Sequence, residues 1–267
     1  MYVEYSAQTI ADFKDILSTY SKMLPLRKYK KIIDVGCGPG NLTAELAKSY
    51  LSKDLVKLVG VDVCEDVIEY ARKNYGPDSK IDFRQLDITT KEIPQNLRNK
   101  FDLVTSFYCL QVIADFKKAL QNMCAMVKPG GDLFIYFMGE CFPLDIWNYL
   151  GETARWKPYM KNYKKIMCPI HFSKNRVQIV EDILKESGYI VHLCTEQNYQ
   201  KVYNKESITG FFKSMSYFDI PKDMENDFML DHLEYFRRCN LNFWGENREE
   251  NFIYNYTLII IYATKQL

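Results

Sequence analysis

The amino-acid sequence predicts an α/β domain built on a mostly parallel β-sheet. Short β-branched runs alternate with segments of helical periodicity, an order typical of a parallel sheet with helices on both faces. A glycine-rich loop follows the first of these runs, where a strand would pass into a helix. The 267 residues, 47% of them hydrophobic, are enough for one large core, and no repeat or linker divides them.

The first predicted elements are an N-terminal helix and two strand–helix units. Residues 1–30 hold an amphipathic helix, because their apolar side chains recur at helical spacing. Residues 31–35 are β-branched and apolar, as expected of a short strand. Residues 41–47 carry two leucines four positions apart beside alanines, which favours a helix. A second strand at 58–63 and a second helix at 65–75 repeat this pattern.

The alternation continues to the middle of the chain. A third strand is predicted at 81–86 and a fourth at 101–107. The segment 116–127 has helical periodicity and is stopped by the Lys-Pro-Gly-Gly sequence at 128–131, because proline and glycine end helices. A fifth strand follows at 132–137.

The second half of the chain is less regular. Residues 141–169 form an aromatic segment in which neither a strand nor a helix pattern is evident. A helix is predicted at 173–187, with Ser173 as its N-cap and Gly188 directly after its end. The remaining predictions are a strand at 189–194, helices at 208–212 and 224–238, and a long closing strand at 252–263.

The composition argues against several classes of function. The 35 basic and 34 acidic side chains nearly cancel, which disfavours binding nucleic acid or acidic membranes by bulk charge. The longest apolar run, 258–263, is far shorter than the ~20 residues of a membrane span. The N-terminus lacks the pattern of an export signal, so a cytoplasmic location is expected. The eight scattered cysteines are expected to be thiols, and the three histidines lack metal-site spacing, so no metal is expected.

The most informative motif is the glycine loop Asp34-Val35-Gly36-Cys37-Gly38-Pro39-Gly40. Glycines let backbone amides approach a ligand closely and aim the following helix N-terminus at it. The loop departs from the dinucleotide pattern GxGxxG, because Asn41 stands at the third position. The acid two residues before Gly36 favours a cationic or amine-bearing ligand. The loop resembles the signature loop of the Rossmann-like, S-adenosylmethionine-dependent methyltransferases, which implies S-adenosyl-L-methionine as the cofactor.

Residues at the ends of the next predicted strands extend this resemblance. Asp62 ends the second strand, where its carboxylate can accept both ribose hydroxyls. The resemblance places Asp87 on the adenine amine and Ile88 on the adenine ring, and it sets Ser106 and Phe107 beside the sulfonium. All of them follow strand ends, where open α/β sheets bind ligands. The expected cofactor-binding residues are Asp34, Gly36, Cys37, Gly38, Gly40, Asp62, Val63, Asp87, Ile88, Ser106 and Phe107.

A second resemblance extends over essentially the whole chain. Residues 101–113, Trp147, Trp156 and the segments 168–171 and 218–223 look like the corresponding parts of the insect juvenile hormone acid O-methyltransferases. That family methylates the carboxylate of long apolar acids such as farnesoic acid. The resemblance implies one methyltransferase domain with a seven-stranded sheet, whose C-terminal strand is antiparallel. The implied organisation is a single domain over 1–267, with a cofactor-binding half at 30–140 and acceptor-side helical insertions forming a lid at 141–172 and 204–245.

Carboxyl methylation suits the residues that are present. A carboxylate is ionised at neutral pH, so no general base is required, and none is evident. Direct in-line transfer then depends on alignment in a dry pocket, which alone can supply ~7–11 kcal/mol. The insertions are expected to cover an apolar pocket, with Tyr108, Phe142 and Trp147 as substrate contacts. The expected partner is a small apolar carboxylic acid, bound by a monomer or a homodimer.

One motif departs from the family pattern. Family members usually carry His-Trp where this chain has Gln111-Val112, and that tryptophan is thought to help hold the substrate carboxylate. Val112 has no donor, so other side chains are expected to hold the carboxylate. The candidates are the Gln111 amide, Gln8 and Tyr5 of the N-terminal helix (where a strict alignment places Thr9), and His171. The departure leaves open a hydroxyl or amine acceptor, which would need a base near Phe107, or a cofactor- or terpenoid-binding protein that has lost catalysis.

Overall fold

The computed structural model describes residues 7–20, 22–24, 28–49, 54–76 and 80–267. Its strands are β1 Lys31–Val35, β2 Lys57–Asp62, β3 Ile81–Gln85, β4 Phe101–Phe107, β5 Val127–Cys141, β6 Tyr189–Asn204, β7 Asn242–Trp244 and β8 Glu250–Lys265. Its α-helices are α1 Ala7–Tyr20, α2 Asn41–Ser49, α3 Glu65–Tyr75, α4 Phe116–Met126, α5 Phe142–Leu150, α6 Arg176–Glu186, α7 Lys205–Ser214 and α8 Glu225–Arg238. Short 3₁₀ helices lie at Leu110–Val112, Tyr163–Ile166, Pro169–Phe172 and Lys222–Met224.

The strands of the described residues join one sheet in the order β3-β2-β1-β4-β5-β8-β6, with β7 paired to β8 beside this path. Strands β1 to β5 run parallel, and β8 runs antiparallel to both β5 and β6. The prediction of a mostly parallel sheet with an antiparallel C-terminal strand is confirmed. The sheet has eight strands rather than the predicted seven, because the three-residue β7 is too short to leave a pattern in the sequence.

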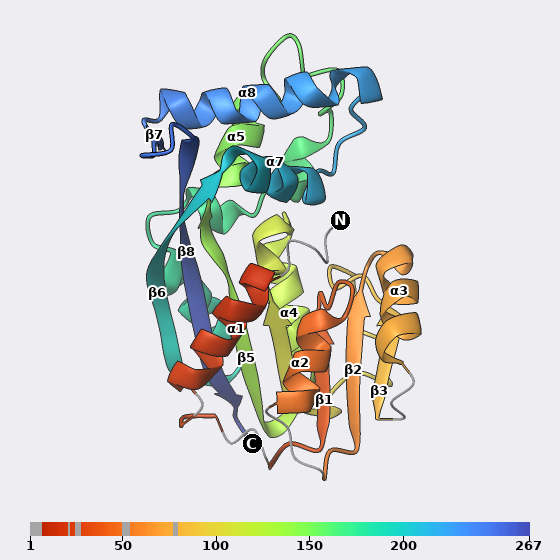
Figure 1. Ribbon diagram of the computed structural model, residues 1–267. Helices are drawn as coiled ribbons and strands as arrows, with labels where there is room; N and C mark the ends of the chain where they lie inside the picture. The colour runs from red at the N-terminus through yellow and green to blue at the C-terminus, as the bar shows by residue number, and fades with distance from the viewer. Residues whose placement is uncertain (1–6, 21, 25–27, 50–53, 77–79) are drawn as a thin grey trace.

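Helices cover both faces of this sheet and also one of its ends (Figure 1). Helices α1, α2 and α3 lie on one face, and α4 and α6 lie on the other. Helices α5, α7 and α8 gather beyond the carboxyl ends of the parallel strands, where β6 and β8 extend to meet them. The two segments predicted as acceptor-side insertions therefore lie at the end of the sheet where α/β proteins bind ligands.

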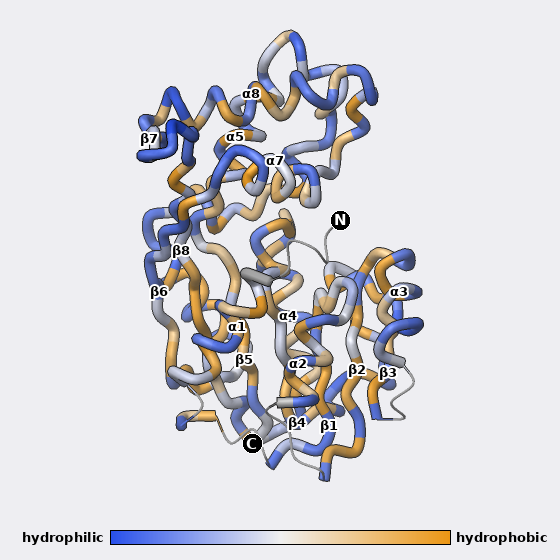
Figure 2. Tube along the Cα trace, in the orientation of Figure 1, coloured by the Kyte–Doolittle hydropathy of each residue, from blue (hydrophilic) through white to orange (hydrophobic). Residues whose placement is uncertain are grey.

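The central strands are buried on both faces, which is why they appear in the sequence as continuous apolar runs. Figure 2 shows the hydrophobic residues concentrated along these strands and the hydrophilic residues on the outer helices. One core cluster joins the sheet to α1 and α2 and continues into α5, α7 and α8, through residues such as Phe13, Phe134 and Trp147. A second cluster joins the opposite face to α4 and α6, through residues such as Leu120 and Leu184.

The aromatic segment at 141–169 contains a helix that the sequence pattern did not indicate. Helix α5 begins directly after β5, with a proline in its first turn. Its buried residues include Leu144, Ile146, Trp147 and Leu150, which lie on more than one side of the helix. Because an apolar stripe on a single face is the usual mark of a surface helix, a helix buried on several sides escapes that criterion.

Other boundaries also differ from the prediction. Strand β5 begins at Val127 and takes in the Lys-Pro-Gly-Gly sequence, with a shift of register against β4. Helix α6 begins at Arg176, and its N-cap is Asn175 rather than Ser173. The hydroxyl of Ser173 instead accepts a hydrogen bond from the backbone amide of Asn175 at 3.1 Å. Strand β6 continues to Asn204, past the predicted end at 194, because its pairing with β8 extends along its length.

All eight cysteines are free thiols. Burial raises the pKa of Cys109, Cys124, Cys141 and Cys168 to about 12, so these four stay protonated at neutral pH. Among the described residues, no helix is both long enough and apolar enough to cross a bilayer.

Candidate cofactor and acceptor site

The glycine loop between β1 and α2 has three glycines with left-handed backbone conformations, and the surroundings of the middle one differ from those of the other two. Gly36 has φ +72°, and a Cβ there would lie 2.2 Å from the Sγ of Cys109. Gly40 has φ +85°, and its Cβ would lie 2.9 Å from the ring of Phe83. Gly38 has φ +52°, but a Cβ there would meet nothing within 4 Å. The first and third glycines therefore pack against the protein, whereas the middle one faces open space.

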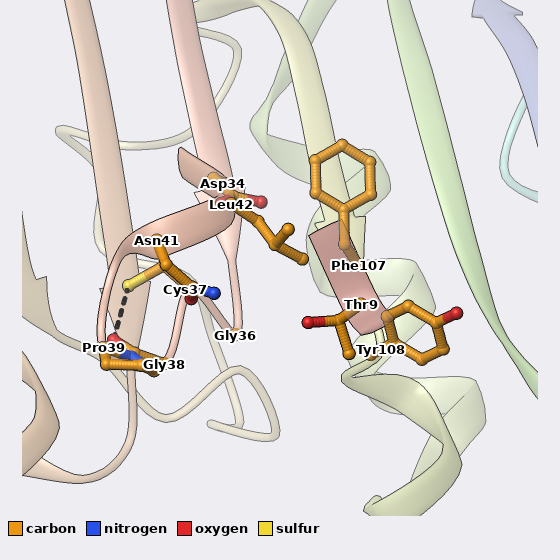
Figure 3. Close-up of a pocket in the computed structure, with 10 residues that line it drawn as sticks. All are labelled: Thr9, Asp34, Gly36, Cys37, Gly38, Pro39, Asn41, Leu42, Phe107 and Tyr108. Carbon is orange, nitrogen blue, oxygen red and sulfur yellow. Dashed lines mark hydrogen bonds between the residues drawn. The ribbon is translucent and has the colours of Figure 1, made fainter. Parts of the chain in front are cut away.

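The loop forms one wall of a pocket, here called the loop pocket (Figure 3). Opposite the loop lie Phe107 and Tyr108 at the end of β4, with Thr9 of α1 beside Tyr108. The loop pocket thus lies between a wall of backbone and an aromatic wall, at the carboxyl ends of β1 and β4. The residues that line it are Thr9, Asp34, Gly36, Cys37, Gly38, Pro39, Asn41, Leu42, Phe107 and Tyr108.

A second pocket, here called the outer pocket, lies past the carboxyl ends of β2 and β3. It is lined by Val63, Gln85, Leu86, Asp87, Thr90 and Pro94. Asp62 is not among the described lining residues of either pocket, but it is bonded to Gly38 of the loop pocket and is followed by Val63 of the outer pocket. Its Oδ2 accepts a hydrogen bond from the amide of Gly38 at 3.0 Å, and its Oδ1 accepts one from the amide of Cys64 at 3.0 Å. A carboxylate has about four acceptor positions, so Asp62 keeps two while these bonds hold it in place.

Asp34 lies beneath the loop rather than free in the pocket. Its side chain is 2% exposed and accepts hydrogen bonds from the hydroxyl of Thr43 at 2.5 Å and from that of Thr105 at 3.0 Å. The pKa of Asp34 is raised to about 6, and burial is the largest cause. The hydroxyls of Thr43 and Thr105 act to lower this pKa, and the nearby charge of Asp62 acts to raise it. Asp34 thereby fixes β1 to β4 and α2, and it adds negative charge at the floor of the loop pocket.

Asn41 is a site residue that the sequence analysis did not select. Its Nδ2 is buried without a hydrogen-bond partner in the described structure, and the residue lines the loop pocket. A buried donor without a partner costs about 1–3 kcal/mol, so this nitrogen fits a ligand that brings an acceptor oxygen. Its position directly after Gly40, as the first residue of a helix, is the signal that could have indicated it.

Of the two residues predicted to contact adenine after the third strand, only Asp87 lies at the outer pocket. Asp87 is exposed, lines the outer pocket, and accepts hydrogen bonds at its Oδ1 from the amide and the hydroxyl of Thr89. Ile88 is not brought to this pocket, because its side chain packs into the core cluster on the α4 face. The neighbouring Leu86 lines the pocket instead, since β3 ends at Gln85 and the chain then turns.

At the end of β4, Phe107 lines the loop pocket and Ser106 does not. The hydroxyl of Ser106 is fully buried and donates to the carbonyl of Val35 at 2.7 Å. Successive residues of a strand point to opposite faces, so these two cannot both face the pocket. Ser106 therefore joins β4 to β1 and is removed from the expected contacts with the sulfonium.

The predicted acceptor contacts are placed very differently from one another. Tyr108 lines the loop pocket and has φ +54°. The Nε2 of Gln111 donates to the carbonyl of Tyr108 at 2.7 Å, and its buried Oε1 has no partner. Gln111 and the half-buried Val112 are absent from the described lining of both pockets. Tyr5 lies outside the described residues, as does the side chain of Gln8, whereas the neighbouring Thr9 lines the loop pocket.

His171 has a structural position, which corrects its prediction as a donor to the acceptor. Its Nδ1 accepts a hydrogen bond from the amide of Cys141 at 3.2 Å, so its Nε2 carries the proton and donates to Asp145 at 2.9 Å. These bonds join the end of β5 to α5. The two aromatic candidates of α5 pack likewise: Trp147 contacts the ring of Phe218, and Phe142 contacts the rings of α8. None of these three candidates is among the described residues that line either pocket.

Comparison with known proteins agrees with this geometry. A family model described as a methyltransferase domain matches residues 26–205. The juvenile hormone acid O-methyltransferase of Bombyx mori is 32% identical over 251 residues, covering 89% of this chain and 87% of that protein. The enzyme of the same name from Drosophila melanogaster is 28% identical over 265 residues, covering 95% and 87%. Among solved structures, a methyltransferase of Bacillus halodurans, described as putative, superposes with a TM-score of 0.62 at 15% identity, covering 95% of this chain and all of that one, which shows the fold.

Proposed function

The chain belongs to the methyltransferase family that includes the juvenile hormone acid O-methyltransferases and uses S-adenosyl-L-methionine, and on this premise we propose that it methylates the carboxylate of a small, apolar acid. One observation carries the choice of acceptor. The similarity to the two insect enzymes covers 87% of each of them and includes the helices beyond the sheet, not only the cofactor loop. Their names state that they act on juvenile hormone acid, a carboxylic acid.

The residues of the two pockets support the placement of the cofactor. When bound, S-adenosyl-L-methionine supplies a methyl group on a positively charged sulfur, and the methyl–sulfur bond breaks as the bond to the acceptor oxygen forms. The open side of Gly38 and the donor of Asn41 fit the amino-acid part of the molecule. Asp62, between the pockets, is placed for the ribose hydroxyls, and Asp87 in the outer pocket for the adenine amine.

A carboxylate acceptor also fits what the loop pocket lacks. A hydroxyl acceptor would need a base beside the methyl group, whereas a carboxylate is ionised at neutral pH without help. Among the described residues of the pocket, Asp34 accepts hydrogen bonds from two threonines beneath the loop. Burial raises the pKa of Cys37 and of Tyr108 well above their ordinary values, which keeps both protonated. These side chains therefore do not provide a free base.

In this proposal the chain accelerates transfer by alignment and by excluding water. Phe107 packs against Phe13 of α1 at a ring distance of 5.2 Å and against Tyr136 at 4.9 Å, so the aromatic wall is held by both α1 and β5. A dry wall strengthens the attraction between an acceptor anion and the sulfonium. Holding the oxygen in line with the methyl–sulfur bond can supply ~7–11 kcal/mol. We place residues 30–140 as the cofactor-binding half and the insertions at 141–172 and 204–245 as the acceptor side.

We further propose a cytoplasmic location, which is supported by the eight free cysteines, because disulfides are rare in that compartment.

A different acceptor has one observation in its favour. Within the described part of the chain, the buried carbonyl oxygen of Gln111, whose amide bonds Tyr108 of the loop pocket, has no partner, and such an acceptor matches an N–H or O–H rather than a carboxylate. A hydroxyl- or amine-bearing acceptor is therefore the second candidate.

One experiment separates the candidate functions. The protein is incubated with methyl-labelled cofactor and a panel of terpenoid and fatty acids, together with the alcohol and the amine of matched chain length. Carboxyl methylation predicts a base-labile methyl ester from the acids alone. A methyl ether or amine would favour the second candidate. Calorimetric binding of cofactor and acid without any product would identify a binding protein that has lost catalysis.

A further inference from the structure

Four polar side chains meet within the otherwise apolar core on the α1 face, and here they are called the Asp12 cluster: Asp12, Tyr108, Lys201 and Tyr256. Asp12 is 8% exposed. Its Oδ2 accepts hydrogen bonds from the hydroxyl of Tyr108 at 2.6 Å and from that of Tyr256 at 3.0 Å. The ammonium of Lys201 donates to both oxygens of Asp12, at 2.7 and 2.8 Å. The cluster thus ties together α1, the end of β4, β6 and β8.

The cluster stands directly behind the aromatic wall of the loop pocket. Tyr108 belongs to both, since its residue lines the pocket and its hydroxyl bonds Asp12. Figure 3 shows this hydroxyl pointing away from the glycine loop. With the cofactor at the loop as proposed above, the cluster lies on the side of the pocket opposite the cofactor.

The surroundings of the cluster match an acid with an apolar tail. The ammonium of Lys201 lies 5.1 Å from the centre of the Tyr256 ring, which stacks on Tyr199 at 5.3 Å. Further rings continue from Tyr254 to Phe211 of α7, 5.5 Å apart. A positive charge next to a series of aromatic rings offers one contact for a carboxylate and another for a hydrocarbon chain.

Lys201 differs from the other lysines of the molecule. Its side chain is 16% exposed, whereas the other ion-paired lysines in the described residues are 48–70% exposed. Arg176 is as little exposed, but it pairs with Glu140 and Glu196 at the start of α6, on the opposite face of the sheet. Burial lowers the pKa of Lys201, and Asp12 counteracts this effect.

We propose that Lys201 binds the carboxylate of the acceptor, with Asp12 as the positioning residue that holds its ammonium behind Tyr108. This inference rests on the proposed carboxyl methyl transfer. Two protons of the ammonium serve Asp12, and the third is left for the acceptor. The negative charge of Asp12 offsets the positive charge of Lys201, so the pair is neutral overall. The positive sulfonium therefore balances the negative charge of an acceptor carboxylate bound there.

The test uses a variant in which both charges are removed. Lys201→Met alone leaves Asp12 buried without its counter-ion, so a loss of activity in that variant could reflect misfolding. The double variant D12N/K201M keeps the length of the Asp12 side chain, shortens that of Lys201 by one atom, and leaves no unpaired charge. Lys265→Met serves as the matched control, because Lys265 is also partly buried but bonds the carbonyls of Cys124 and Val127, at the opposite end of the sheet.

Steady-state kinetics use the acid that the wild type methylates best. Calorimetry then compares the binding of this acid with the binding of its primary amide. We expect D12N/K201M to raise KM for the acid at least about tenfold, the effect of one lost charged hydrogen bond, with a smaller change in kcat. Its preference for binding the acid over the amide should fall by the same factor, while its cofactor Kd and its Tm stay close to those of Lys265→Met. If Asp12 and Lys201 have only a structural role, D12N/K201M will keep the wild-type preference for the acid over the amide. That result would overturn this inference and leave the proposed function standing. A wild type that methylates no acid overturns the proposed function and this inference together.

Discussion

The carboxylate of Asp62 accepts a hydrogen bond from the backbone amide of Gly38 at 3.0 Å. This contact fixes the end of β2 to the middle of the glycine loop, at the position where the loop faces open space. A single side chain thereby sets the position of the loop and also presents its own remaining acceptor positions between the two pockets.

Replacing Asp62 with alanine should therefore weaken cofactor binding without unfolding the protein. Each lost charged hydrogen bond costs about 1–3 kcal/mol, so the Kd should rise by roughly tenfold to a hundredfold or more. Calorimetric titration with S-adenosyl-L-homocysteine measures this change. Asp82→Ala is the matched control, because Asp82 lies on the adjacent strand and bonds Arg84 rather than the glycine loop. Equal affinities for the two variants would contradict the role given to Asp62.

Alanine at Gly36 should mainly reduce stability, whereas alanine at Gly38 should mainly reduce cofactor binding. A Cβ at Gly36 would lie 2.2 Å from a buried sulfur, so Gly36→Ala should lower the free energy of unfolding by more than about 2 kcal/mol. A Cβ at Gly38 meets no atom of the described residues within 4 Å, so Gly38→Ala should cost only about 1–2 kcal/mol of left-handed backbone strain. It should nevertheless reduce cofactor affinity at least about tenfold, because the methyl group enters the ligand space. Thermal unfolding and calorimetry on both variants check the contrast.

The stability of the fold should depend on the ionisation of Asp34. Burial raises its pKa from 3.8 to about 6, so the folded state holds this proton more tightly than the unfolded chain. The resulting stabilisation is present below about pH 4 and is lost as the pH rises through about 6. Asp34→Asn, which stays neutral, should gain roughly 3 kcal/mol relative to the wild type between about pH 4 and pH 7. Urea unfolding of the wild type and of Asp34→Asn across this range measures the gain, and equal stabilities at pH 7 would contradict it.

Alanine at His171 should affect stability but not binding. Its two ring nitrogens bond Cys141 and Asp145 within the segment 141–172, and their loss should lower the free energy of unfolding by about 2–4 kcal/mol. The cofactor Kd and the KM for an acid should remain within about twofold of the wild type at a temperature where the variant is folded. A selective rise in the acid KM would restore His171 as an acceptor contact.

Local patterns in the sequence predict the parts of the site that local structure determines. The loop at 34–40, the strand ends at Asp62 and Phe107, and the position of Asp87 shortly after β3 agree with the patterns, because strand–turn–helix units are set by neighbouring residues. Errors of one or two residues arise where strand ends decide which face a side chain takes. Ile88 enters the core while Leu86 lines a pocket, and the hydroxyl of Ser106 faces β1.

Local sequence patterns do not predict most of the acceptor side, because its contacts join residues that are far apart in the sequence. Asp12 and Lys201 lie 189 positions apart, and each by itself resembles an ordinary surface residue of an amphipathic segment. Only the pairing of β6 with β8 and the packing of α1 bring them together. The role predicted for Gln111 depends on its place in the family motif and that of His171 on its chemical type. In the structure Gln111 instead bonds the carbonyl of Tyr108 three residues earlier, and His171 bonds the amide of Cys141.

A crystal structure with S-adenosyl-L-homocysteine tests most directly where the cofactor binds. The account predicts ribose hydroxyls on the carboxylate of Asp62, the amino-acid part beside Gly38 and Asn41, and adenine in the outer pocket near Asp87. Density for the molecule at any other place, or a Gly38 that stays open to solvent at saturating ligand, would contradict it.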